Sequence, residues 1–346
     1  MIRLSSGISA LALSISAPAW AEVPNVVADF APVQSLVAQV MGDLADPNVI
    51  LPPGASPHSH AMRPSEARVL SRADIVFWVG EDLTPWMDRA LETLAPDAHK
   101  VELLEVEGTV LREFRTGATF DAHDHEHEGS ETDHDDRGHD DHSDHDEGAD
   151  HDDHADHDRH TGDDDHAAEA HHAHDGHAHD PHAWLDPENG RRWLAAIADT
   201  LSEADPENAD TYAANAQAGI DGLTALQAEL AEELSPIRNL SFVVFHDAFQ
   251  YFERRFGLNA AGAITLGDAS DPSAARLTEV RDAIVSLDVT CVAAEPQFNP
   301  DLINAVAEGA GVTTTVLDPA GLGLEDGPTL YPDLLRGIAS GLLACR

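Results

Sequence analysis

Three of the five histidines outside the histidine-rich part of the sequence share a context, because each stands beside a predicted structural element. His58 follows a short strand predicted over 49–51, and His246 ends an apolar run over 242–245. His182 begins the ordinary sequence after the histidine-rich tract. In open α/β sheets ligands bind beyond the carboxyl ends of strands, so His58 and His246 stand where a site is expected. Imidazole suits Zn²⁺, and three protein ligands with one variable position are typical of an accessible zinc site.

Two more residues are candidates for the same site. Asp318 follows a strand predicted over 313–317 and is a candidate fourth ligand, with water as the alternative. His60 lies two residues beyond His58, where a histidine is more often a solvated neighbour than a ligand. Spacing alone is a weak signal, because widely separated triples of histidine also arise by chance.

The segment 121–180 differs in composition from the sequence on either side. It holds 17 of the 22 histidines and 24 acidic residues, with almost no large apolar side chains. Such a segment cannot bury enough surface to offset its ordering entropy, so we predict a disordered insertion within the N-terminal lobe. We expect its imidazoles and carboxylates to bind several Zn²⁺ ions weakly. The alternative is an acidic segment that only solvates the surface.

The charge of the chain argues against some classes of partner. The formal net charge is -45 at pH 7. Nucleic acid and anionic membrane surfaces would be repelled, so cations are the natural ligands. We expect a monomer with no nucleic-acid partner.

Residues 1–21 have the features of a Sec-type signal peptide. Arg3 precedes an apolar stretch over 8–15, and residues 19–21 supply an A-x-A cleavage site. A membrane anchor is the alternative, but the apolar run is well short of the ~20 residues of a spanning helix. We therefore expect a soluble protein exported to the periplasm.

Apolar patterns on both sides of the tract predict an α/β fold. Before it, strands are predicted over 25–30, 48–51 and 74–80 and helices over 32–41 and 64–71. After it, strands are predicted over 241–245, 261–265, 289–294 and 313–317, and helices over 248–256, 272–286 with Asp271 as its cap, 300–308 and from about 331. This alternation is typical of mostly parallel sheets flanked by helices. We expect two lobes, because ~325 residues exceed what one core usually organises.

Two helices are predicted between these halves. Asp186-Pro187 opens one that runs to about 204, and Asp205-Pro206 opens a second with an apolar stripe that continues to 234. The second would be about 44 Å long and could join the lobes, although Gly219 and Gly222 weaken it. We therefore divide the chain after the signal peptide into an N-terminal lobe over 22–205, a linking helix over 206–234 and a C-terminal lobe over 235–346.

Cys291 and Cys345 are the two cysteines of the chain. In an oxidising compartment an even pair is more often bridged than free, with two buried thiols as the alternative. Two cysteines this far apart are too few and too distant for a zinc-ribbon type of site.

Several segments around the candidate ligands have a recognisable pattern. They are LPP at 51–53, GASPH at 54–58, MRPSE at 62–66, ADIVFWVG at 73–80, HAWLDP at 182–187 and FHDAFQYF at 245–252. In this order they resemble the ZnuA family of zinc-binding proteins, which belongs to the metal-specific cluster of ABC substrate-binding proteins. A histidine- and aspartate-rich insertion before the second ligand segment is also a feature of that family.

The resemblance covers nearly all of the chain after the signal peptide. It implies two α/β lobes joined by one long helix, with metal bound in the cleft by His58, His182 and His246. It also implies a disulfide between Cys291 and Cys345, and capture of Zn²⁺ for delivery to an inner-membrane ABC permease. Manganese carriers of the same cluster usually place a carboxylate where His246 stands, so three histidines favour zinc.

One position departs from the family pattern. Pro57 stands where some ZnuA proteins carry a glutamate that is able to act as a fourth ligand. Asp318 aligns with the aspartate that ligates metal in the manganese-type relatives. The fourth ligand is therefore Asp318 or water.

Two other functions are compatible with three histidines. A secreted zinc hydrolase also uses three histidines and a water, but the sequence has no H-E-x-x-H helix or other recognisable general-base motif. A periplasmic zinc buffer would differ only in lacking a permease partner. The resemblance favours a carrier that is not an enzyme.

Overall fold

The computed structural model describes residues 23–115, 119–120, 179–265 and 272–346. The predicted signal peptide, positions 121–178 of the histidine-rich tract and the predicted cap Asp271 lie outside these residues. No helix among the described residues is long and apolar enough to cross a membrane.

The first sheet has four parallel strands in the order β2-β1-β3-β4. They are β1 (Val26–Ala28), β2 (Asn48–Val49), β3 (Ile75–Trp78) and β4 (His99–Glu102). The central strands β1 and β3 are buried throughout, as expected for parallel strands covered on both faces. Their carboxyl ends therefore meet at one edge of the sheet.

Helices cover the two faces of this sheet. They are α1 (Ala31–Met41), α2 (Pro64–Leu70), α3 (Pro85–Leu94) and α4 (Pro187–Ala204), and all four have proline in the first helical turn. Proline suits that turn because its missing N–H would have no partner there. The Asp186 side chain caps α4 by accepting from the Glu188 backbone N–H at 2.9 Å, as the sequence predicts.

The second sheet repeats the arrangement, with parallel strands in the order β6-β5-β7-β8. These are β5 (Phe242–His246), β6 (Gly262–Thr265), β7 (Cys291–Ala294) and β8 (Thr313–Val316). The accompanying helices are α6 (Gln250–Phe256), α7 (Ala274–Ser286), α8 (Pro300–Ala307) and α9 (Leu330–Leu343). The predicted fold of two parallel α/β sheets flanked by helices is thereby confirmed.

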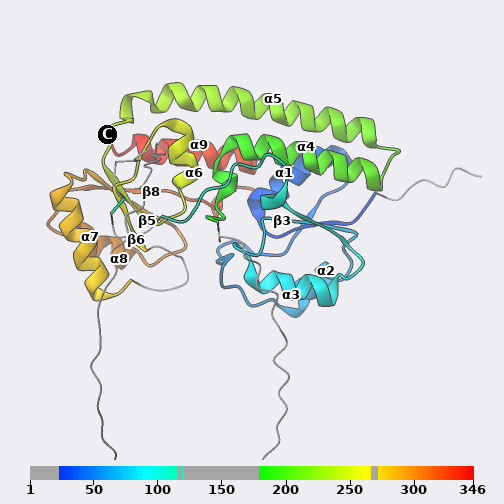
Figure 1. Cartoon of the computed structure of the whole chain (residues 1–346), viewed down its shortest axis with the longest axis horizontal. Helices are drawn as coiled ribbons and strands as arrows, with labels where there is room; N and C mark the ends of the chain where they lie inside the picture. The colour runs from blue at the N-terminus through cyan, green and yellow to red at the C-terminus, as the bar shows by residue number, and fades with distance from the viewer. Residues whose placement is uncertain (1–22, 116–118, 121–178, 266–271) are drawn as a thin grey trace, which may run out of the picture. The chain divides into compact units, whose positions relative to one another are not determined.

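Helix α5 (Ala209–Leu234) is continuous and contacts helices from both halves of the chain, namely α1, α4, α6 and α9. Figure 1 shows it alongside α4 and α9. Gly219 permits close approach, because a Cβ at this position would lie 2.9 Å from the Leu194 side chain and 3.0 Å from that of Gln39. Gly219 thus lies where the neighbouring side chains pack closely, whereas a Cβ at Gly222 would meet nothing within 4 Å.

The two sheets share one hydrophobic core. The largest cluster of buried side chains runs from Val26 of β1 through Trp193 of α4 and Leu226 of α5 to Phe242 of β5 and Tyr331 of α9. The opposite face of each sheet has a smaller cluster of its own. The alternation of side chains along each strand produces this division.

Some predicted boundaries were wrong. The long helix begins at Ala209 rather than at 206, and Ser273 caps α7 by accepting from the Arg276 backbone N–H at 3.2 Å. Helix α3 and strand β4 were not predicted. Strand β4 is a half-exposed edge strand whose residues HKVE lack an apolar pattern. The division of the chain into lobes at 205 and 234 stays a prediction.

The predicted disulfide between Cys291 and Cys345 is confirmed. It joins the first residue of β7 to the segment after α9, with the two Cα atoms 5.5 Å apart. The bond ties the end of the chain to the second sheet.

Candidate metal site

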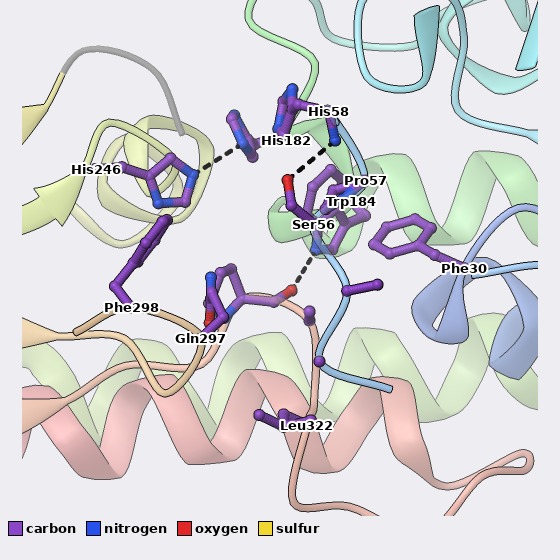
Figure 2. Close-up of a pocket in the computed structure, with 14 residues that line it drawn as sticks. Phe30, Ser56, Pro57, His58, His182, Trp184, His246, Gln297, Phe298 and Leu322 are labelled. Atoms are coloured by element: carbon purple, nitrogen blue, oxygen red, sulfur yellow. Dashed lines mark hydrogen bonds between the residues drawn. The ribbon is translucent and has the colours of Figure 1, made fainter. Parts of the chain in front are cut away.

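The structure brings together the three histidines that the sequence singles out. His58 lies in the loop between β2 and α2, His182 lies directly before a short 3-10 turn that leads to α4, and His246 is the last residue of β5. One ring nitrogen from each lies within 4.8 Å of those of the other two. Figure 2 shows the three rings turned toward one another. Three neutral imidazoles in this arrangement can bind one divalent ion.

Two of the rings are fixed by buried carboxyl groups. His182 Nδ1 lies 2.7 Å from Asp180 Oδ1, and His246 Nδ1 lies 2.6 Å from Glu295 Oε1. When Nδ1–H donates to the carboxyl oxygen, the lone pair of each ring is on Nε2. The two Nε2 atoms face each other at 3.2 Å. Two acceptors directed at one point are suited to share a cation, and carboxyl groups behind the histidines are typical of zinc sites.

Burial favours the neutral form of the His182 ring, which is the form that binds metal. His182 and His246 are each 4% exposed, and His58 is half-buried. Desolvation lowers the pKa of His182 well below its usual range, and the nearby His246 lowers it further. The neutral ring is the form that binds metal, so protons compete weakly at this position.

The histidines open into a small pocket with mainly apolar walls. Its volume of about 40 Å³ is enough for an ion with a water molecule. Aromatic rings from both halves of the chain form part of the wall, namely Phe30, Trp184 and Phe298. An apolar surround of this kind limits access of water to a bound ion.

Asp318 and His60 are not part of the histidine cluster. Asp318 Oδ1 accepts from the backbone N–H groups of Ala320 and Gly321 at 3.0 and 2.9 Å. His60 Nε2 lies 2.8 Å from Glu66 Oε2. Each group is thus engaged outside the cluster, and a ligand role for either residue stays a prediction.

The sequence reasoning missed the two carboxyl groups behind the rings. Asp180 lies two residues before His182, where it was counted as part of the acidic tract. Glu295 directly follows β7, the strand next to β5, so the rule on strand ends that selects His246 would also have selected Glu295. Its second oxygen, Oε2, accepts from Gln297 Nε2 at 2.8 Å.

The segment 180–186, which carries His182, is held by contacts from the C-terminal half. The Arg255 guanidinium pairs with both carboxylate oxygens of Asp186, each at 2.7 Å. Tyr331 Oη donates to the backbone oxygen of Trp184 at 2.6 Å. His182 is therefore placed by both halves of the molecule.

Comparison with known proteins gives a consistent result. Residues 26–345 match the ZnuA family, described as zinc-uptake complex component A, periplasmic. The chain is 48% identical to the high-affinity zinc uptake system protein ZnuA of Paracoccus denitrificans, over 100% of this chain and 99% of that protein.

The fold also matches solved structures. A crystal structure of ZnuA has a TM-score of 0.69 at 21% identity, covering 93% of this chain and 99% of that one. The protein FpvC of Pseudomonas aeruginosa in complex with Mn²⁺ also has a TM-score of 0.69, at 20% identity, with 93% and 98% covered.

Proposed function

This chain belongs to the ZnuA family, and we propose that it binds one Zn²⁺ with His58, His182 and His246 in the periplasm and delivers it to an inner-membrane ABC permease. The observation that carries the proposal is the convergence of three ring nitrogens within 4.8 Å of one another. The ion is cargo, so the site must release it as well as bind it.

The site has features that suit a carrier rather than an enzyme. Three protein ligands leave one coordination position for water or for Asp318, and an incomplete set of ligands releases metal faster than four protein ligands would. The curated relative from Paracoccus denitrificans is named as part of a zinc uptake system.

The choice of zinc over manganese depends on His246. Imidazole nitrogen favours zinc, whereas carboxylate oxygen suits manganese. All three members of the cluster are imidazoles, and Glu295 accepts from the far side of the His246 ring. We infer that this set of ligands selects Zn²⁺.

Two substitutions at one position test the proposal. We expect His246→Ala to lose most of the tight zinc binding, and His246→Asp to shift preference from Zn²⁺ toward Mn²⁺. Competitive titration of the purified chain against Zn²⁺, Mn²⁺ and Ni²⁺, with a chelator that masks weak sites, measures both effects. Unchanged zinc affinity in His246→Ala would show that the site is elsewhere.

The partner requires a separate test. Vesicles that contain the cognate permease should take up Zn²⁺ when the loaded wild-type chain is added outside, and not when His246→Ala replaces it. Zinc binding without any stimulation of uptake would favour a periplasmic buffer.

A further inference from the structure

One tryptophan contacts the chain on both sides of His58, at Pro57 directly before it and at His60 two residues after it. The Trp86 indole Nε1–H donates to the backbone oxygen of Pro57 at 2.5 Å. The same ring packs edge-on against the His60 ring, with centroids 5.2 Å apart and an angle of 72° between the planes. His58 therefore lies in a stretch of chain that a single side chain of α3 holds from both ends.

The contact on the His60 side is itself fixed. His60 Nε2 lies 2.8 Å from Glu66 Oε2, and the same oxygen accepts from the Arg63 backbone N–H at 2.7 Å, where α2 begins. The His60 and Glu66 side chains are only 7% and 11% exposed. The indole thus packs against a ring that the first turn of α2 immobilises.

His58 is the cluster member whose position depends most on a loop. His246 is the last residue of a buried strand, and His182 directly precedes a 3-10 turn in a buried segment. His58 lies within residues 50–63, which form neither strand nor helix. A ligand on such a segment needs other contacts to hold it in place, because a small displacement breaks a metal bond.

We propose that Trp86 is a positioning residue for the zinc site, which holds the Pro57 carbonyl through its indole N–H and thereby places the His58 ring. This inference rests on the proposed function. It also gives His60 a role other than ligation, since His60 packs against the indole rather than joining the cluster.

A double-mutant cycle tests the proposal. Trp86→Phe keeps an aromatic ring beside His60 and removes the N–H that reaches Pro57. Loss of a residue that orients a ligand typically costs ten- to a hundredfold in metal affinity, so we expect Trp86→Phe to weaken zinc binding roughly tenfold. In a His58→Ala background we expect a further change of less than about twofold, because the ring that Trp86 places is gone.

The His246→Ala variant serves as a control that distinguishes a positioning role of Trp86 from a general loss of folding. In His246→Ala, where His58 remains, Trp86→Phe should still weaken the residual binding roughly tenfold. The d–d absorption of bound Co²⁺ should change with Trp86→Phe when His58 is present and stay the same when it is absent. Both readouts use the full chain, with chelators of graded affinity so that the tight site and the weakened variants are each measured within range.

Each outcome has a defined meaning. Equal losses in the wild-type and His58→Ala backgrounds, or no loss in the wild type, would overturn the positioning role. If His58→Ala alone left zinc affinity unchanged, the proposed zinc site itself would be wrong. Should Trp86→Phe fail to fold, site-specific replacement of Trp86 by benzothienylalanine removes the N–H with little change in volume, and the same cycle then decides.

Discussion

Glu295 Oε1 lies 2.6 Å from the Nδ1 atom of His246 and 3.1 Å from its backbone nitrogen. One carboxyl oxygen thus sets both the end of strand β5 and the direction of the imidazole ring. The other oxygen is held by Gln297, so the carboxyl group has little freedom to turn. The direction of the His246 ring therefore depends on a residue of the neighbouring strand.

Removing this carboxyl group should weaken zinc binding while the fold remains. We expect Glu295→Ala to lower zinc affinity about 10- to 100-fold, because the His246 ring loses the acceptor that orients it. Glu295→Gln should lose less, since its amide oxygen still accepts from Nδ1–H. Chelator competition measures the affinity, and thermal unfolding without metal controls for stability. Wild-type affinity in Glu295→Ala would contradict the argument.

Glu102 should make stability depend on pH. The pKa of Glu102 is raised from 4.5 to about 7, mainly by burial and also by the carboxylates of Glu105, Asp82 and Glu81, against an opposing backbone hydrogen bond from Glu81. Between these two values the folded chain keeps a proton that the unfolded chain has released. The Glu102 contribution to the free energy of unfolding is therefore full below pH 4.5 and is lost as the pH rises through about 7.

Glu102→Gln removes this dependence. Relative to the wild type, we expect little effect near pH 5 and a gain of about 1 kcal/mol near pH 8, a figure reduced for solvent screening of a half-exposed group. Urea unfolding at the two pH values measures it. Glu105→Gln removes one repelling neighbour and should produce a smaller gain in the same direction. A gain that is equal at both pH values would show that charge is not the cause.

The disulfide should contribute to stability and not to metal binding. Cys291 and Cys345 are 54 positions apart, and closing such a loop stabilises a fold by about 4 kcal/mol on the chain-entropy argument. We expect no titratable thiol until the chain is reduced and unfolded. The Cys291→Ser/Cys345→Ser variant should unfold at lower temperature with unchanged zinc affinity. Lost zinc binding in the folded variant would mean that the bond also supports the site.

Excising residues 121–178 should leave the tight site intact. The chain on each side is held by the described structure: the Phe120 N–H donates to the Ala261 oxygen at 2.9 Å, and the Asp180 N–H donates to the Arg112 oxygen at 2.8 Å. With a short Gly/Ser linker between Phe120 and His179, we expect one tight zinc site to remain and additional weaker sites to disappear. Titration calorimetry compares the two chains. Loss of the tight site would mean that the excised segment supplies primary ligands.

Part of the candidate site could be predicted from the sequence, because local patterns mark the elements that carry its residues. Apolar runs locate β5, and the rule that ligands bind beyond strand ends selects His246. Asp186 as the cap and Pro187 as the first helical residue predict the start of α4 to the residue. Patterns of this kind depend on a few neighbouring positions, so they are readable without the fold.

The same reasoning fails where burial does not mark an element. Strand β4 is half-exposed at the edge of its sheet, so its residues carry no apolar signal. The cap of α7 was assigned to Asp271, whereas the Ser273 hydroxyl, two residues later, accepts the bond that starts the helix. Both aspartate and serine are good caps, and only the backbone path decides between them.

The sequence alone determined the two α/β halves through apolar patterns, and it determined the three histidines and the cysteine pair through motifs that resemble the ZnuA family. The tertiary structure decided which atoms meet. It placed the Nε2 atoms of His182 and His246 at 3.2 Å although the residues are 64 positions apart, and it set Glu295 behind one ring. The pairing of β5 with β7 brings Glu295 beside His246, and neither periodicity nor charge along the chain specifies which strands pair.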